Sequence, residues 1–115
     1  MTNKKINYKT FLSKEQYRIT RNGETEAPYT GEYCSLFKPG TYHCICCNAP
    51  LFSSKTKLNT GGGWPDFSQA IKEAQIKYVD DFTLGYKRVE VKCNDCDAHL
   101  GHIFNDGPPP DYKRY

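Results

Sequence analysis

The sequence has no long hydrophobic run. Its mean hydropathy is −0.76, and no segment approaches the ~18–20 consecutive apolar residues that a membrane-spanning helix needs. The first residues include lysines, but they lack the apolar run of about 7–15 residues that marks a secretory signal. These absences favour a protein that acts in the cytoplasm and is not inserted in a membrane.

Charge of one sign is equally scarce. The chain has 16 Lys and Arg against 13 Asp and Glu, a net charge of +3. The charges are scattered, and the pI of about 8.5 lies below the values above about 9 that are typical of nucleic-acid-binding domains. We therefore expect neither a nucleic-acid partner nor a membrane partner.

Cysteine is too sparse for a disulfide scaffold. Six of the 115 residues are Cys, whereas small disulfide-rich domains exceed about 8–10%. In the reducing cytosol such cysteines are usually metal ligands or catalytic groups. The aromatic content of 14% allows a core built from a few large side chains. We expect a single domain over residues 1–115, of which 1–11 form a flexible N-terminal segment.

Local signals predict one short helix near the N-terminus. Ser13 and Gln16 have the spacing of a capping box, in which each side chain accepts a hydrogen bond from the other residue's amide. Asn22-Gly23 supplies a left-handed end. The spacing therefore predicts a helix from Lys14 to Arg21.

Most of the remaining chain has the patterns of short strands and turns. Val89 and Val91 alternate with charged residues between positions 86 and 93, as in a half-buried strand. A second short helix is expected over residues 68–75. The balance predicts a mainly β, antiparallel fold with a short N-terminal helix.

The strongest local signal is a pair of Cys-x-x-Cys motifs, each followed by a residue that tolerates left-handed geometry, Asn48 or Asp97. Zinc takes four thiolates in a tetrahedron, and the two-residue spacing lets one tight turn donate two of them. The long separation predicts a structural zinc clamp between two β-hairpins. Disulfides or inert buried thiols are the alternatives. The expected metal ligands are Cys44, Cys47, Cys93 and Cys96.

Two cysteines remain outside these motifs. Cys34 and Cys46 are interpreted as buried, inert thiols, although the predicted loop around Cys34 leaves an exposed thiol as the alternative. Two histidines, His99 and His102, follow the second motif at once. Because four cysteines already saturate a zinc ion, the histidines either handle protons or form structural hydrogen bonds, and spacing alone leaves both open.

These pieces resemble one family, the methionine-R-sulfoxide reductases of the B type, also called the SelR domain family. The matching segments keep the family's order from about residue 12 to residue 115. They are Gly31-Glu32-Tyr33, Tyr42 to Cys47, Pro50-Leu51-Phe52, Gly63 to Phe67, Glu90 to Cys93, His99 to Phe104, Asp106-Gly107-Pro108 and Arg114-Tyr115.

The resemblance implies a fold of two antiparallel sheets in a barrel-like arrangement, with a structural zinc. It also implies the repair of oxidised methionine by reduction of the R epimer of its sulfoxide, free or in proteins. Trp64 would line the pocket for the substrate's S-methyl group, with Phe104 beside it. His99 and His102 would surround the sulfoxide oxygen, and Arg114 would support the nucleophile.

The chain departs from the family at three points. Asp66 stands where Ser is usual, and Gly62 stands where many members have a recycling cysteine. The resemblance therefore leaves Cys34 or Cys46, or an external dithiol such as thioredoxin, to regenerate the enzyme.

The third departure concerns the nucleophile. The family places its catalytic Cys or selenocysteine immediately after Arg114-Tyr115, where the 115-residue sequence stops. We expect this polypeptide to be nearly inactive, as a selenoprotein chain interrupted at its selenocysteine codon or as a chain trimmed on purpose. The alternative function is a non-enzymatic, zinc-stabilised β domain that binds a protein partner.

Overall fold

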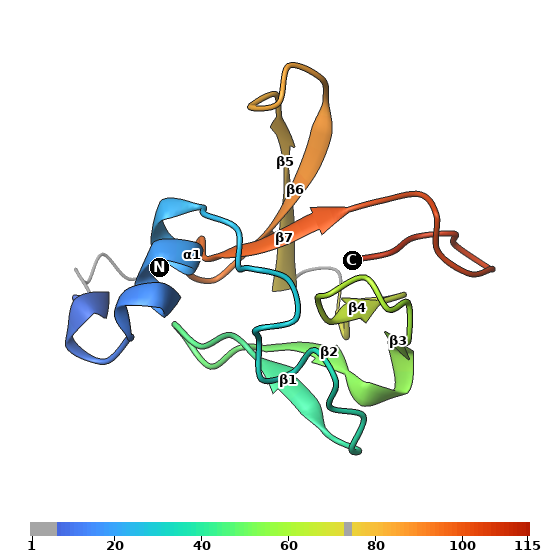
Figure 1. The fold of residues 1–115 in the computed structure, drawn as a ribbon, viewed down its shortest axis with the longest axis horizontal. Coiled ribbons are helices and arrows are strands. Elements are labelled where there is room, and N and C mark those ends of the chain that lie inside the picture. The colour runs from blue at the N-terminus through green and yellow to red at the C-terminus, as the bar shows by residue number, and fades with distance from the viewer. Residues whose placement is uncertain (1–6, 73–74) are drawn as a thin grey trace.

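The computed structural model describes residues 7–72 and 75–115 (Figure 1). No helix among these residues has both the length and the apolar character needed to cross a membrane. The elements, in chain order, are η1 (Tyr8–Thr10), α1 (Lys14–Asn22), β1 (Thr41–His43), β2 (Pro50–Ser53), η2 (Ser54–Thr56), β3 (Lys57–Leu58), β4 (Asp66–Phe67), β5 (Ile76–Asp81), β6 (Arg88–Cys93) and β7 (His99–Ile103).

The strands form three antiparallel sheets, which pair β1 with β2, β3 with β4, and β5 with β6 and β7. The mainly β, antiparallel prediction is confirmed, but the described residues hold three sheets rather than two. The physical reason is that η2 separates β2 from β3, so the ladder is interrupted there and β3 pairs with β4 over only two residues.

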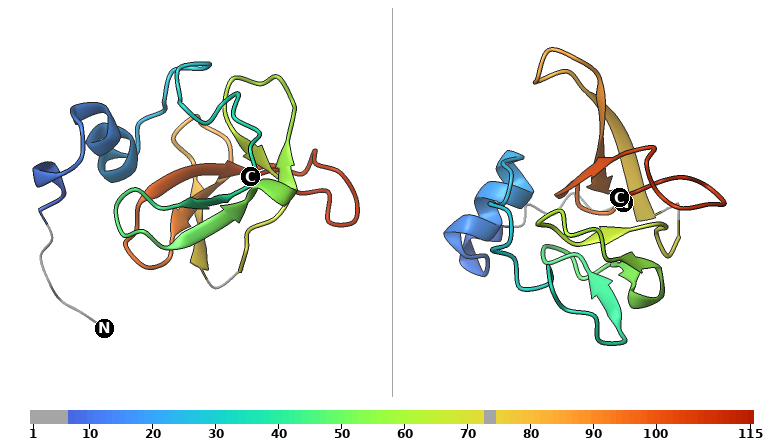
Figure 2. Two further views of the ribbon diagram at one scale, coloured as in Figure 1. Left: turned by 90° about the horizontal axis from the view of Figure 1, so that it is seen from below. Right: turned by 45° about the vertical axis from the view of Figure 1, so that its right-hand side comes forward.

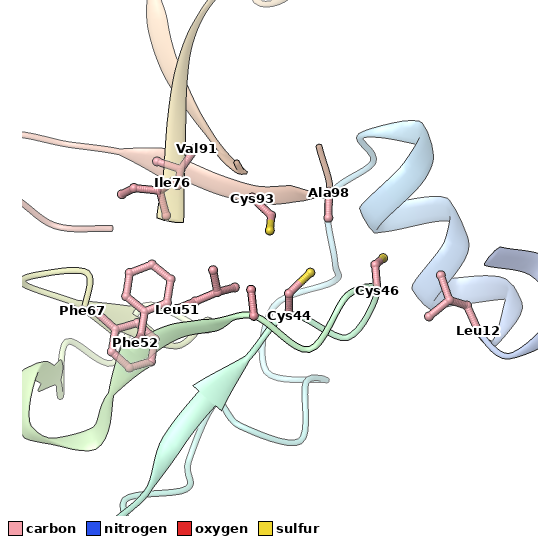
Figure 3. Packing of buried hydrophobic residues seen from close by; sticks show 11 residues of the cluster. Leu12, Cys44, Cys46, Leu51, Phe52, Phe67, Ile76, Val91, Cys93 and Ala98 are labelled. Atoms are coloured by element: carbon pink, nitrogen blue, oxygen red, sulfur yellow. The ribbon is translucent and has the colours of Figure 1, made fainter. Parts of the chain in front are cut away.

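The core lies between the two small sheets and the three-stranded sheet. In Figure 3, Leu51 and Phe52 of β2 and Phe67 of β4 lie on one side, and Ile76 and Val91 lie opposite them. Val91 is only 2% exposed, as the alternation in this segment predicted. The side chains buried in this cluster are Leu12, Cys44, Cys46, Ala49, Leu51, Phe52, Phe67, Ile76, Val91, Cys93 and Ala98.

Helix α1 confirms the capping prediction. The Ser13 Oγ accepts a hydrogen bond from the Gln16 amide (3.0 Å), and the Gln16 side chain accepts one from the Ser13 amide (2.9 Å). Gly23 ends the helix with a φ of 72°. The helix extends one residue further than expected, to Asn22.

The expected flexible segment falls partly outside the described residues, since 1–6 are not among them. Residues 8–10 instead form the 3-10 helix η1. The Tyr8 ring lies 4.2 Å from the Arg21 guanidinium, so this turn is held against the last turn of α1.

The short helix expected over residues 68–75 is wrong for residues 68–72, which are not helical. Residues 73–74 lie outside the described residues, and Gln75 is in a 3-10 turn, where its amide donates to the Lys72 carbonyl at 3.0 Å. The Ser68 amide donates to the Thr56 carbonyl and the Ile71 amide to the Leu51 carbonyl, both at 2.9 Å. Bonds to η2 and β2 therefore hold residues 68–72 in an extended course along these elements.

The C-terminal segment runs between two sheets. Arg114 exchanges both backbone hydrogen bonds with Phe104, just beyond β7, and Tyr115 exchanges both with Phe67 of β4. Figure 2 accordingly shows the C-terminal residue close to the β3–β4 hairpin. The loop before it closes tightly at Gly107, where a Cβ would lie 2.0 Å from the Lys113 carbonyl oxygen. Successive residues of this segment therefore bond to opposite neighbours and tie the two sheets together.

Candidate functional site

The structure brings the four predicted metal ligands together. The sulfur atoms of Cys44, Cys47, Cys93 and Cys96 all lie within 4.8 Å of one another. The shortest separations are 3.6 Å between Cys44 and Cys96 and 3.5 Å between Cys47 and Cys93. A tetrahedral zinc ion with Zn–S bonds of about 2.3 Å needs sulfurs about 3.8 Å apart. The cluster therefore has the donor type and the size of a four-thiolate metal centre.

Two turns of the same geometry present these sulfurs. In the first, the Cys44 amide donates to the Ala49 carbonyl and the Asn48 amide donates to the Cys44 carbonyl, both at 2.8 Å. Asn48 has a φ of 65°, and Asp97 in the second turn has the same value. The left-handed geometry expected at both positions is confirmed. The second turn repeats the two bonds, from Cys93 to Ala98 (2.9 Å) and from Asp97 to Cys93 (2.8 Å).

Two thiols of this cluster favour their protonated form when no metal is bound. Burial raises the pKa of the Cys44 thiol, and burial also raises the pKa of Cys96 strongly. A metal ion would replace these protons, because the thiolate is the ligand. The cluster is thus suited to binding a cation and poorly suited to acting as a free nucleophile.

The two remaining cysteines lie outside the cluster. Cys46 is buried and lies on the side of α1, between Cys44 and Leu12 (Figure 3). Cys34 is half-buried in the loop before β1, and its amide donates to the Gly31 carbonyl at 3.2 Å. The expectation of a buried thiol is met at Cys46 but not fully at Cys34.

A β-bulge places His99 and His102 on the same face of the three-stranded sheet. Residues three apart in a regular strand point to opposite faces. Here Val91 pairs with Gly101 while Lys92 pairs with His99, so one residue of β7 is left over between them. The bulge reverses the alternation, and the two imidazole ring centroids lie 5.7 Å apart.

Each histidine is oriented by a carboxylate from another strand of the same sheet. His99 Nδ1 lies 2.7 Å from a carboxylate oxygen of Glu90 on β6, and His102 Nε2 lies 2.7 Å from a carboxylate oxygen of Asp81 on β5. Arg88 also reaches Asp81, at 3.2 Å. Hydrogen bonds from the Thr83 amide and then from His102 hold the pKa of Asp81 well below its ordinary value. An ionised carboxylate only accepts, so His102 donates through Nε2.

The loop that carries Trp64 is braced by residues 26–29. The indole Nε1 donates to the Glu26 carbonyl at 2.8 Å, and the Tyr29 amide donates to the Gly63 carbonyl at 2.7 Å. Gly63 has a φ of 96°, and a Cβ there would lie 2.7 Å from the Pro28 Cβ. Only glycine fits both the backbone and the space, and the bracing leaves Trp64 41% exposed.

Arg114 is held in a network of two carboxylates and one aromatic ring. Its guanidinium donates to both carboxylate oxygens of Asp106, at 2.8 and 3.1 Å, and to Asp66 at 3.2 Å. It also lies 4.5 Å from the centre of the Phe104 ring. The hydrogen bonds between Arg114 and Asp106 raise the pKa of the arginine and lower that of the carboxyl. Asp66 is buried and also accepts from the Thr60 hydroxyl.

Comparison with known proteins decides the family. A sequence model of the SelR domain matches residues 12–115. The chain belongs to the SelR family. The peptide methionine sulfoxide reductase MsrB of Escherichia coli O139:H28 (strain E24377A / ETEC) is 47% identical over 104 residues, which cover 90% of this chain and 76% of that protein. The resemblance seen in the sequence motifs is therefore confirmed at the level of the family.

In this SelR domain, Arg114 connects the segments that carry two of the expected substrate-site residues, Phe104 and Trp64. Phe104 lies two residues beyond His102, on the same side of the extended β7 segment, and it contacts Arg114. Trp64 comes from the neighbouring loop, two residues before Asp66, which Arg114 also contacts. Two hollows in the described part of the chain lie elsewhere, one beside the first metal turn and one around Tyr115.

The sequence did not reveal three acidic partners of these residues, namely Asp81, Glu90 and Asp106. The pairing of the strands brings Glu90 of β6 to His99 of β7 and brings Asp81 of β5 to His102 within the same sheet. Asp106 is eight residues from Arg114 along the chain and meets it across the closing loop. The only sequence signal for these residues was the position of Glu90 in the alternating strand. That position is equally typical of a solvated side chain and of one that pairs with a histidine.

Proposed function

We propose that this SelR protein reduces methionine-R-sulfoxide through a Cys or selenocysteine nucleophile at the position that follows Tyr115. The observation that carries the proposal is the course of the C-terminal segment, which the backbone bonds of Arg114 and Tyr115 hold between β4 and the end of β7. The family membership and the MsrB relative support the reaction.

The extended geometry supports a definite position for the nucleophile. Side chains of an extended segment alternate between its two sides. A residue after Tyr115 would share the side of Arg114, which contacts Phe104 and Asp66, while Tyr115 itself points toward Tyr78. A thiolate or selenolate there would lie beside a guanidinium, which favours the anionic form that attacks.

The reaction transfers one oxygen atom. The nucleophile attacks the sulfoxide sulfur, the sulfur–oxygen bond breaks, and the oxygen passes to the enzyme as a sulfenic or selenenic acid while methionine leaves. A dithiol such as thioredoxin then supplies two electrons, becomes a disulfide, and releases the oxygen as water. Cys34 is the better-exposed candidate for a resolving thiol, because Cys46 is buried beside α1.

The side chains of the candidate site have different roles in the proposed reaction. His99 and His102 supply the proton that the leaving oxygen needs, and Glu90 and Asp81 fix their ring orientations through the 2.7 Å contacts. Trp64 and Phe104, which are 41% and 37% exposed, form apolar walls for the S-methyl group. Glu90 and Asp81 are positioning residues, since they act through the histidines.

The four-cysteine centre is proposed to hold structural zinc. Bound by four thiolates, zinc supplies a cross-link with no open coordination position. The ligands come from the turn between β1 and β2 and from the turn between β6 and β7. The centre therefore clamps a small sheet to the sheet that carries the histidines. A cytoplasmic location remains a prediction of the sequence.

The proposal is tested by comparing the 115-residue polypeptide with one extended by Cys after Tyr115. We expect dithiol-dependent reduction of the R epimer of methionine sulfoxide by the extended chain, and neither reduction of the S epimer nor turnover by the 115-residue chain. Replacing His99 or His102 by Gln in the extended chain should lower kcat by about 10²–10⁴-fold. A folded, metal-loaded extended chain without R-selective activity would contradict the proposal.

A matched pair of acidic residues tests the role of Asp81. Asp81→Asn should lower kcat and shift its pH profile, because His102 loses its orienting anion. Asp80→Asn is the control, since Asp80 lies one residue earlier in β5 and forms an exposed pair with Lys87 at 3.7 Å. Equal activity of the two variants would argue against a positioning role for Asp81.

A further inference from the structure

Arg21 of α1 reaches the metal centre from a distant part of the chain. Its Nη2 donates to the backbone carbonyl of Cys96 at 2.5 Å, across 75 residues of sequence. The other side of the guanidinium faces the Tyr8 ring, 4.2 Å from the ring centre. The second metal turn, α1 and η1 are thereby held together through one side chain.

The neighbours of Arg21 differ from those of the other arginine in the helix. Arg18 forms an exposed ion pair with Glu24 at 2.8 Å, whereas Arg21 forms no carboxylate ion pair within the described ranges 7–72 and 75–115. The Arg21 guanidinium is instead anchored at the backbone of one expected metal ligand, through its bond to the Cys96 carbonyl. Its positive charge is therefore held beside the second metal turn.

A charge in this place acts on a metal–thiolate centre. A divalent ion bound by four thiolates carries two net negative charges, and they are costly in the buried setting that Cys93 and Ala98 provide, each of which is 0% exposed. A nearby guanidinium offsets part of that cost. Groups outside the ligand set commonly change metal affinity by about 10–100-fold.

We propose that Arg21 is a positioning residue of the metal centre. It strengthens metal binding by holding a positive charge beside the thiolates, at a place fixed by its bond to the Cys96 carbonyl and its stacking on Tyr8. This inference rests on the proposed zinc centre and is independent of the catalytic steps. It also gives the N-terminal helix a role, because docking of α1 becomes coupled to metal binding.

The test measures zinc affinity by competition with a chromogenic chelator, using the full 115-residue chain and zinc alone. We expect Arg21→Gln to weaken zinc binding by about tenfold. Arg21→Lys should retain most of the affinity, because it keeps the charge. Arg18→Gln is the matched control in the same helix and should bind zinc as tightly as the wild type.

Two results would overturn the inference while leaving the zinc centre intact. In the first, Arg21→Gln takes up its full zinc content and has the same zinc affinity as Arg18→Gln. In the second, Arg21→Lys binds zinc as weakly as Arg21→Gln. If Arg21→Gln does not fold, Tyr8→Leu serves instead. This substitution removes the ring on which the Arg21 guanidinium stacks and keeps the positive charge. It should bind zinc more weakly than the wild type, and an unchanged affinity would overturn the inference. A wild-type chain that takes up no zinc would overturn the metal centre itself.

Discussion

The two ends of the three-stranded sheet differ in chemistry although the same strands build both. At one end, Cys93 closes β6 and is 0% exposed, next to the buried Ala98. Toward the other end, Asp81 of β5 and His102 of β7 are paired by a hydrogen bond and are partly open to water. One end gathers thiols in an apolar setting, and the other gathers ionisable groups in hydrogen-bonded pairs.

The difference follows from what each group tolerates. Thiols can be buried without a partner at little cost, and they become a cross-link only when a cation joins them. Carboxylates and imidazoles need hydrogen-bond partners wherever water is excluded. The sheet thus separates a stabilising centre from a surface whose groups can exchange protons, and the strands between them keep the two in a fixed relation.

The largest effect is expected from removing a ligand of the four-cysteine centre. Cys93→Ser should abolish stoichiometric zinc binding and lower the free energy of unfolding by more than about 4 kcal/mol, because the cross-link between the turns is lost. Metal analysis and urea denaturation measure both effects. Cys34→Ser is the control, because Cys34 lies outside the cluster. Full zinc content in Cys93→Ser would contradict the four-cysteine centre.

A smaller effect is expected at the Trp64 loop. Gly63→Ala should lower the free energy of unfolding by about 3 kcal/mol, because its φ of 96° and its contact with Pro28 both oppose a Cβ. Gly61→Ala is the matched control, with a φ of 72° and nothing within 4 Å of the added atom. It should cost only about 1 kcal/mol. Equal losses in thermal or urea denaturation would show that Pro28 does not constrain the loop.

Disrupting the charged network around Arg114 should lower the free energy of unfolding by less than Gly63→Ala does. Arg114→Met leaves the buried Asp66 carboxylate with the Thr60 hydroxyl but without its cation. We expect a loss of about 1–3 kcal/mol in the free energy of unfolding. The double variant Arg114→Met, Asp66→Asn should be more stable than Arg114→Met alone. If urea denaturation gives additive losses, Asp66 and Arg114 are not coupled.

The smallest effect is a dependence on pH confined to the polar end. The lowered pKa of Asp81 means that its ionised form contributes stability above the ordinary Asp pKa of about 3.9. This contribution is lost as the pH falls through the folded-state value. Asp81→Asn should therefore be less stable than the wild type near pH 6, and the gap should narrow as the solution is acidified. Asp80→Asn, at the exposed pair, should show little difference at any pH.

The features that the sequence predicted correctly are local. The capping box of α1 and the left-handed residues Asn48 and Asp97 depend on groups within a few positions of one another. The alternation around Val91 also reports a local pattern, because a strand has a period of two. The metal-ligand motifs and the histidine pair could be predicted because each is a short run of neighbouring residues. The same short motifs indicated the family.

The predictions that failed depended on partners elsewhere in the chain. The helix expected over 68–75 is absent from residues 68–72, where carbonyls of η2 and β2 accept from the Ser68 and Ile71 amides. The charged network of Arg114 was not predicted either, because Asp66 is 48 residues away. No local rule gives the energy of a bond to a residue so far along the chain.

The sequence by itself determined the types of side chain, the two metal turns, the helix with its caps and the membership of the SelR family. Only the tertiary structure decided that a bulge in β7 turns both histidines to one face, that Glu90 and Asp81 orient them, and that Arg21 approaches the second metal turn. The physical reason is that local rules fix backbone geometry over a few residues, whereas the register of β5, β6 and β7 selects which distant side chains meet.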